Sequence, residues 1–169
     1  KVAVAYIGDW SDSMKCKELA LAQFNLQGAD VGFAAAGGAG LGVLDAAKEA
    51  GRYAIGMNTD QSLIFKDSDP EKAEAILSSC VSDMGAMLFD TIVKHIDGTL
   101  AYGSCDVFTL GNTYSYLSKS EYYQKNVSQD IQQYMLELEE KAASGEIKLV
   151  SAYDMSTEEV KAFIEAAKP

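Results

Sequence analysis

The sequence predicts an α/β fold in which a parallel sheet is flanked by helices. Apolar runs with β-branched and aromatic residues, typical of buried strands, recur at residues 2–8, 30–36 and 52–58. Stretches with the helical period separate these runs, and they end at Gly28 and Gly51, where glycine favours a helix stop. The turns between the runs are short, which is the pattern of successive strand–helix–strand units.

The first half of the chain contains two clear helix signals. The first helix is expected at residues 13–27, where Asp12 or Ser13 can cap its start. The second helix is expected at residues 40–51, directly after a glycine-rich turn at residues 37–42. The apolar face of the first helix consists of Cys16, Leu19, Ala20 and Phe24.

The second half is less regular. We expect a charged loop at 67–74, strands at 75–81 and 106–110, and helices at 83–97 and 131–145. A final helix is predicted after the capping-box pattern formed by Ser156 and Glu159. The helix at 83–97 carries an apolar stripe that needs a cover, either a second copy of the chain or residues outside this sequence. The stripe consists of Met84, Met87, Leu88 and Ile92.

Composition and charge exclude several classes of function. The hydrophobic content of 48% and the charged content of 23% are those of a globular domain. The net charge of −11 argues against a nucleic-acid partner and against an anionic membrane surface. No apolar run reaches the length of about 20 residues that spans a bilayer. The chain begins with Lys1 and shows no leader, so its compartment does not follow from this sequence alone.

No motif for catalysis or metal binding is present. Cys16, Cys80 and Cys105 lie far apart, and His95 is the only histidine, so neither a zinc site nor a disulfide framework is predicted. His95 lies beside an apolar stripe and is expected to be a packed helix residue. The sequence lacks G-x-S-x-G, H-E-x-x-H and P-loop patterns. We therefore expect no catalytic residue, no cofactor and no metal.

The turns that follow the three predicted strands are the best candidates for a binding site. Ligands of open parallel sheets bind beyond the carboxyl ends of the strands, and these turns share one edge. They consist of Gly8-Asp9-Trp10, Ala36-Gly37-Gly38 and Asn58-Thr59-Asp60.

Each of these turns also has a purely structural interpretation. The glycine-rich turn can offer backbone N–H groups to ligand oxygens, or it can allow close helix–strand packing. It is not a G-x-G-x-x-G dinucleotide motif, because Val43 occupies the sixth position from Gly38. Asn58 and Asp60 can bind sugar hydroxyls or base edges, or they can form a turn and cap a helix. Trp10 can stack on a flat ligand or pack under a loop.

A family resemblance covers residues 2–98 in order and spacing and is most specific at residues 27–61. The sequence resembles the BMP family, the basic membrane protein or PnrA-like solute-binding lipoproteins of bacterial nucleoside ABC importers. Residues 144–148 also look like the C-terminal end of that family, whereas residues 110–127 match poorly. The matching segments are KELALA at 17–22, QGADV at 27–31, AAGGAGLGV at 35–43, AAKE at 46–49, YAIG at 53–56 and TDQ at 59–61.

The resemblance implies a type I periplasmic-binding-protein fold, in which two α/β lobes close on a ligand about a hinge. Family members are roughly twice as long as this chain, as expected of two lobes. The resemblance therefore places residues 1–82 in the C-terminal lobe and residues 83–169 in the part that recrosses the hinge, with the N-terminal lobe absent. It further implies an extracytoplasmic, membrane-anchored lipoprotein in the full-length protein, with a permease and an ATPase as partners.

The expected function is the binding of a purine nucleoside or related small molecule without catalysis. The family usually has Asp at the position of Asn58 and Lys at the position of Ser82, so both departures bear on the ligand. Trp10 and Phe33 are the candidates for stacking on a base. Two alternatives remain: an enzyme with a Rossmann-like sheet and a nucleotide cofactor, and the ligand-sensing domain of a regulator or receptor. The sequence upstream of Lys1 would separate an importer lipoprotein from a sensor.

Overall fold

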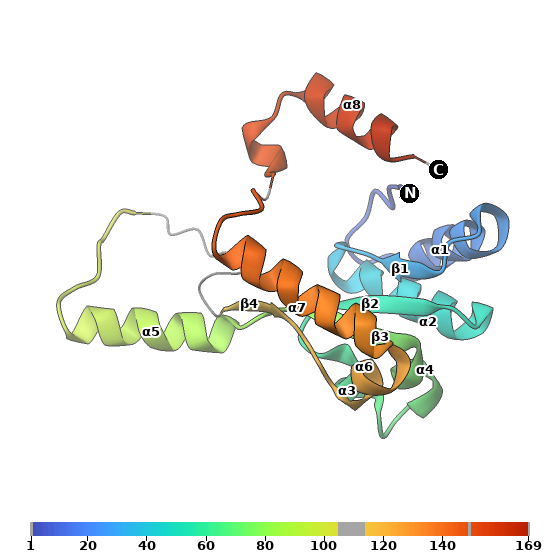
Figure 1. Cartoon of the computed structure of the whole chain (residues 1–169), viewed down its shortest axis with the longest axis horizontal. Coiled ribbons are helices and arrows are strands. Elements are labelled where there is room, and N and C mark those ends of the chain that lie inside the picture. The colour runs from blue at the N-terminus through green and yellow to red at the C-terminus, as the bar shows by residue number, and fades with distance from the viewer. Residues whose placement is uncertain (1, 105–113, 149, 169) are drawn as a thin grey trace.

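The computed structural model describes residues 2–104, 114–148 and 150–168, which form an α/β fold around one four-stranded sheet (Figure 1). The strand order is β1-β2-β3-β4, and the first three strands are parallel. β4 pairs with β3 in the antiparallel direction. The predicted class, a mostly parallel sheet flanked by helices, is therefore confirmed. The strands are β1 Val31–Phe33, β2 Tyr53–Asn58, β3 Ile76–Ser82 and β4 Ser115–Leu117.

Helices α1 (Ser13–Gln27) and α2 (Leu41–Ala50) provide most of the core. They pack against each other and against β1 and β2. Asp12 caps α1 by accepting a hydrogen bond from the Lys15 N–H, and both helices end at a glycine in the left-handed conformation. The predicted boundaries of these helices and of the strand at 52–58 are thus confirmed. Buried residues at the centre of this core include Phe24, Val43, Leu44, Ala47 and Ile76.

Gly42 sets how closely α1 and α2 approach. A Cβ atom at this position would overlap the Ser13 carbonyl oxygen and would lie 2.7 Å from the Lys17 nitrogen. Both of these atoms belong to the α1 backbone, which cannot move aside as the end of a flexible side chain can. The glycine therefore lets the backbones of α1 and α2 come into direct contact. This contact places the turn before α2 at the end of β1.

The remaining elements follow β2 in the chain. The predicted strand at 75–81 is present as β3, the helix at 83–97 as α5, and the capping box of Ser156 and Glu159 begins α8. None of the helices in the described ranges is both long enough and apolar enough to cross a membrane. The further helices are α3 Gln61–Phe65, α4 Pro70–Ala75, α5 Met84–Ile96, α6 Glu121–Asn126, α7 Gln129–Ala143 and α8 Thr157–Ala167, with single 3-10 turns at Gly37–Gly40 and Ala152–Asp154.

The prediction of a strand at residues 2–8 is wrong. This segment is irregular, although the Gln23 side chain donates to the Ala3 carbonyl and the Val2 N–H donates to the Ala167 carbonyl. An apolar run forms a buried strand only where both of its faces are covered. Here Val4 and Tyr6 are exposed, and β1 offers a strand of only three residues. β1 is itself shorter than the predicted 30–36 because the chain turns toward Gly37.

The structure differs from the sequence prediction at α4 and β4 as well. The charged loop at 67–74 contains α4, which Asp69 caps and Pro70 begins. Its start signal, an Asp-Pro pair, is present in the sequence. The predicted strand at 106–110 lies outside the described residues. β4 was not predicted, since a strand of three residues is defined by its pairing with β3 rather than by its own pattern.

α5 projects beyond the sheet (Figure 1), and none of its residues is buried. The apolar stripe is exposed at Met84, Leu88 and Ile92, and half-buried at Met87. The expectation of a packed His95 is therefore wrong: the residue is exposed, and its ring contacts the Tyr102 hydroxyl. No described element covers this side of α5, which agrees with the expectation that the stripe needs a cover from a second copy or from residues outside this sequence; what covers it stays a prediction.

The Gly42→Ala variant tests the role of the close helix contact. We expect the free energy of unfolding to fall by about 3 kcal/mol, because overpacking against a rigid backbone forces α1 and α2 apart. Gly85→Ala in α5 is the matched control, since the nearest atom to its Cβ is the Asp83 carboxylate at an ordinary 3.4 Å. The control should leave stability unchanged or raise it by about 0.5 kcal/mol, as alanine favours helix. Urea unfolding followed by circular dichroism measures both, and equal effects of the two substitutions would contradict the interpretation.

Candidate ligand-binding site

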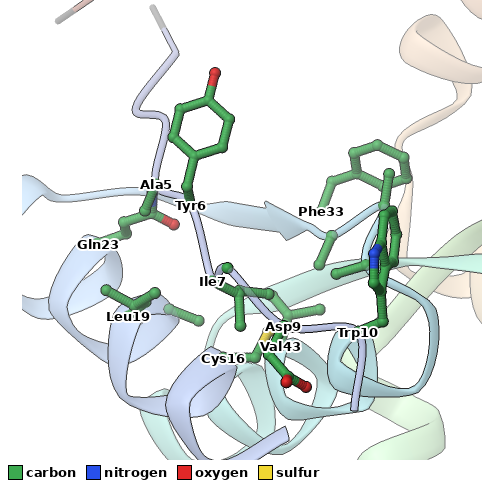
Figure 2. A pocket seen from close by; sticks show the side chains of 15 residues that line it. Ala5, Tyr6, Ile7, Asp9, Trp10, Cys16, Leu19, Gln23, Phe33 and Val43 are labelled. Carbon is green, nitrogen blue, oxygen red and sulfur yellow. The ribbon is translucent and has the colours of Figure 1, made fainter. Parts of the chain in front are cut away.

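A pocket of about 490 Å³ lies between residues 5–10, α1 and the chain that follows β1 (Figure 2). Its volume is in the range of small-molecule sites. The helix side is apolar and is formed by Cys16, Leu19 and Ala20 of α1 and by Val43 of α2. Aromatic side chains from residues 5–10 and from β1 line the opposite side. These are Tyr6, Trp10 and Phe33.

The three aromatic rings are largely accessible, although the main chain that carries Trp10 is fixed. Trp10 is 74% exposed, Tyr6 77% and Phe33 55%. The Ala39 N–H donates to the Trp10 carbonyl at 2.9 Å, which ties this turn to the start of α2. An indole that is anchored through its backbone and open on its ring faces can stack on a flat ligand at little entropic cost. The alternative expectation, a Trp packed under a loop, does not fit this exposure.

The polar groups at the pocket are partly engaged in the protein itself. Asp9 Oδ1 accepts from the Ser11 N–H at 2.6 Å, from the Ser11 hydroxyl at 2.7 Å and from the Asp12 N–H at 2.9 Å. The hydrogen bond from the Ser11 hydroxyl is the main cause of a lowered pKa of Asp9. The Asp9 carboxylate is therefore ionised at neutral pH, and it shapes the turn before α1.

The thiol in the pocket is buried, which disfavours its thiolate form. Desolvation by burial raises the pKa of Cys16, so the thiol stays protonated at neutral pH. Cys80 is the other cysteine in the described part of the chain, and it is also unpaired. The described residues contain no group of three or more His, Cys, Asp or Glu side chains that could hold a metal ion.

The glycine-rich turn packs against the Trp10 turn. Gly37 has φ of +56°, and a Cβ atom there would lie 3.3 Å from the Trp10 carbonyl oxygen. A Cβ atom at Gly40 would lie 3.0 Å from the Ala34 carbonyl oxygen. The Ala39 N–H is already used by Trp10. Of the two interpretations of this turn, close packing accounts for Gly37 and Gly40, and an anion site is not needed to explain them.

Asn58 has the one positive φ, +67°, among the non-glycine residues that the structure describes. The Thr59 N–H donates to the Met57 carbonyl at 2.8 Å, so Asn58 is the central residue of a three-residue turn. A γ-turn with positive φ is rare and strained, and such conformations cluster at ligand sites. This strain makes Asn58 the most distinctive of the predicted polar site residues.

Asp60, by contrast, has a structural role that accounts for it. Its Oδ1 accepts from the Ser62 N–H at 3.1 Å and from the Ser62 hydroxyl at 2.6 Å, and it caps α3. The helix-capping interpretation therefore explains this carboxylate. Ser82 ends β3, where it pairs with Ser115 of β4.

The pocket brings together only part of the predicted set. Trp10, Phe33 and Ala36 line it, whereas Asn58, Asp60 and Ser82 lie outside it. Asn58 of β2 is paired with Val81 of β3, and Ser82 is the next residue of β3. These residues and the Gly37–Gly38 turn share the carboxyl edge of the parallel strands, and their use by one ligand remains a prediction.

Only Trp10, Phe33 and Ala36 of the pocket lining were predicted as site residues, and Tyr6 and Gln23 are two polar side chains among those that the prediction lacked. The prediction of a buried strand at 2–8 would cover the Tyr6 ring, which is exposed in the structure. Gln23 lines the pocket from α1 and ties this helix to residue 3. No local signal identifies Gln23, but its position one turn after Leu19, on the side of α1 that faces residues 2–8, follows from helical spacing.

Comparisons with known proteins agree with the resemblance seen in the sequence. The family model for ABC transporter substrate-binding proteins that are PnrA-like matches residues 1–152. The ABC transporter nucleoside-binding protein BmpA of Lactococcus lactis is 32% identical over 122 residues, covering 66% of this chain and 34% of that protein. Basic membrane protein D of Borreliella burgdorferi is 29% identical over 110 residues, covering 64% and 30%. The matched part of the chain thus covers only about a third of the length of these relatives.

Solved structures show the same fold. An ABC transporter solute-binding protein from Aeropyrum pernix K1 superposes with a TM-score of 0.75 at 22% identity, covering 95% of this chain and 50% of that chain. A transcriptional activator of the comK gene from Bacillus halodurans superposes with a TM-score of 0.70 at 21% identity, covering 83% and 45%. The second likeness shows that proteins named for regulation share this fold.

Substitution of Asn58 by glycine tests whether its backbone is strained. We expect Asn58→Gly to raise the free energy of unfolding by about 1 kcal/mol, because glycine adopts positive φ without a steric penalty. Asn25→Gly, on the exposed side of α1, is the matched control and should lower stability by a few tenths of a kcal/mol, since glycine disfavours helix. Thermal unfolding measures both changes. A loss of stability in Asn58→Gly as large as that in Asn25→Gly would mean that the turn is not strained.

Proposed function

Because the chain belongs to the PnrA-like family of ABC transporter substrate-binding proteins, we propose that it binds a purine nucleoside or a related small molecule without catalysis. The ligand lies at the carboxyl edge of the sheet, between the Trp10 turn and the Asn58 turn. The observation that carries the proposal is the open aromatic rim of the pocket at this edge. The name of the Lactococcus lactis relative, a nucleoside-binding protein, supports the class of ligand.

Each candidate residue has a distinct part in this proposal. Trp10 and Phe33 stack on the base, since both rings are accessible and flank the pocket. Asn58 and Ser82 donate and accept hydrogen bonds with ribose hydroxyls or a base edge. Ala36, Gly37 and Gly38 bring the backbone close to the ligand, and Asp60 supports the Asn58 turn by capping α3.

The wider role follows from the family. In this proposal the chain delivers its ligand to the permease and ATPase subunits of an ABC importer. It acts outside the cytoplasm as part of a lipid-anchored protein. Residues 1–82 belong to one ligand-binding lobe, and residues 83–169 include the helix that leaves this lobe and the strand that returns to it. The projection of α5 from the sheet and the return of the chain as β4 support this division.

The proposal predicts weak binding with a defined dependence on Asn58. The described residues cover the ligand from one side only, so we expect millimolar to high-micromolar affinity for adenosine, guanosine and inosine. Asn58→Asp should tighten binding of these ribosides about fivefold, because a charged acceptor contributes about 1 kcal/mol more than a neutral one. Adenine, which has no ribose, should gain less. Isothermal titration at high protein concentration measures all four ligands.

The matched control for this experiment is Asn25→Asp, which makes the same change of charge on the exposed side of α1. It should leave all four affinities unchanged. If wild-type protein binds none of the four ligands at millimolar concentration, the proposed ligand class is wrong. If Asn58→Asp changes nothing in a protein that does bind, Asn58 is a turn residue and does not contact the ligand.

A further inference from the structure

The strained turn at Asn58 is held by the side chain of a neighbouring residue. Gln61 Oε1 accepts a hydrogen bond from the Met57 N–H at 3.1 Å. Met57 is the residue directly before Asn58, and Gln61 is the first residue of α3. A positive φ at a non-glycine residue persists only where the surrounding structure fixes it. The Gln61 carbonyl provides such a constraint on the β2 side of the turn.

Gln61 is in turn fixed by a buried serine of β3. The backbone N–H of Gln61 donates to Ser79 Oγ at 3.1 Å, and Ser79 is fully buried. The Ser79 backbone is paired with Ser118, which follows β4. The Ser79 N–H donates to Ser118 Oγ at 2.9 Å, and the Ser118 N–H donates to the Ser79 carbonyl at 2.9 Å. A continuous series of hydrogen bonds therefore joins the Asn58 turn to the chain that returns along β4.

Gly56 provides the space for this series. A Cβ atom at Gly56 would lie 2.5 Å from Ser79 Oγ and 2.7 Å from Gln61 Oε1. Gly56 is not among the glycines with positive φ, so its backbone conformation does not require glycine. The absence of a side chain is thus explained by the close approach of the Ser79 hydroxyl and the Gln61 amide.

A second connection runs in parallel to the first. The Ser62 hydroxyl donates to Asp60 Oδ1 at 2.6 Å, and Ser62 Oγ lies 3.1 Å from Ser120 Oγ. Ser62 is fully buried, and an unpaired hydroxyl there would be costly. Two sets of buried and partly buried hydrogen bonds therefore connect residues 57–62 with residues 118–120.

We propose that Gln61 is a positioning residue for ligand binding, and that Ser79 and Ser118 couple its turn to the returning chain. The inference rests on the proposed function, in which Asn58 contacts the ligand. Gln61 holds the backbone so that Asn58 faces the carboxyl edge of the sheet, and it does not touch the ligand itself. Because coupling is reciprocal, a ligand bound to Asn58 also stabilises the docking of residues 118–120.

Two substitutions of Gln61 separate positioning from packing. Gln61→Glu keeps an acceptor oxygen for the Met57 N–H, whereas Gln61→Met keeps the length of the side chain and removes the acceptor. We expect Gln61→Met to weaken riboside binding about fivefold, as the loss of one hydrogen bond predicts, and to weaken adenine binding less. Gln61→Glu should stay within about twofold of wild type. Gln133→Met, on the exposed side of α7, is the matched control and should change neither affinity.

Amide hydrogen exchange and the backbone coupling constant of Asn58, both measured by NMR without ligand, provide an independent readout. In Gln61→Met the Met57 amide should exchange at least tenfold faster, and the coupling constant should no longer report a positive φ. In Gln61→Glu both should match wild type. Unchanged exchange and coupling in Gln61→Met would overturn the inference.

The binding results separate this inference from the proposal on which it rests. If wild-type protein binds no riboside, the proposed function fails, and the positioning role fails with it. If wild-type protein binds but Gln61→Met binds equally well, only the positioning role is overturned. An equal loss for ribosides and adenine in Gln61→Met and Gln61→Glu would show general destabilisation and would also overturn it.

Discussion

The burial of polar groups between β3 and the chain after β4 is the constraint on which the carboxyl edge of the sheet depends. Ser78, Ser79 and Ser118 are all buried: the Ser78 hydroxyl donates to the Ser118 carbonyl, the Ser118 hydroxyl accepts from the Ser79 N–H, and the Ser79 hydroxyl accepts from the Gln61 N–H. Buried polar groups are costly unless they are paired, so the two strands and α3 must stay in one arrangement. That arrangement sets the position of the Asn58 turn. The α1–α2 pair fixes the Trp10 turn independently, through Gly42 and the Ala39–Trp10 hydrogen bond.

Local patterns predicted the parts of the fold that local physics determines. α1, α2 and β2 have clear periodicity and clear stop signals, and their predicted bounds agree with the structure to within about two residues. The run at residues 2–8 has an equally strong pattern but lacks a covering layer, so it remains irregular. β4 has too few residues for any pattern, and its existence depends on pairing with β3. In both cases contacts between segments that are distant in the sequence determine the structure, and local sequence patterns do not encode these contacts.

The candidate site was predictable to a similar extent. The rule that ligands bind beyond the carboxyl ends of parallel strands predicted Trp10, Ala36 and Asn58 at one edge. Trp10 was assigned through a strand at 2–8 that the structure lacks, and the pocket contains Trp10 and Ala36 but not Asn58. The rule did not distinguish Asn58, whose backbone is strained, from Asp60, whose carboxylate caps α3. Gln61 could not be found from the sequence, because its importance lies in where its side-chain carbonyl meets the Met57 N–H. Side-chain hydrogen bonds of this kind become visible only in the structure.

The central claim, a ligand site at the carboxyl edge of the sheet, is tested most directly by mapping adenosine binding on ¹⁵N-labelled protein by NMR. The account predicts saturable shifts that are largest at the indole N–H of Trp10 and at the amides of residues 9–11, 36–38, 57–60 and 82–83. The amides of residues 48–52, which precede β2 at the opposite, amino end of the parallel strands, should not shift. Saturable shifts that cluster in α7 or along α1, with none in the three turns, would contradict the account.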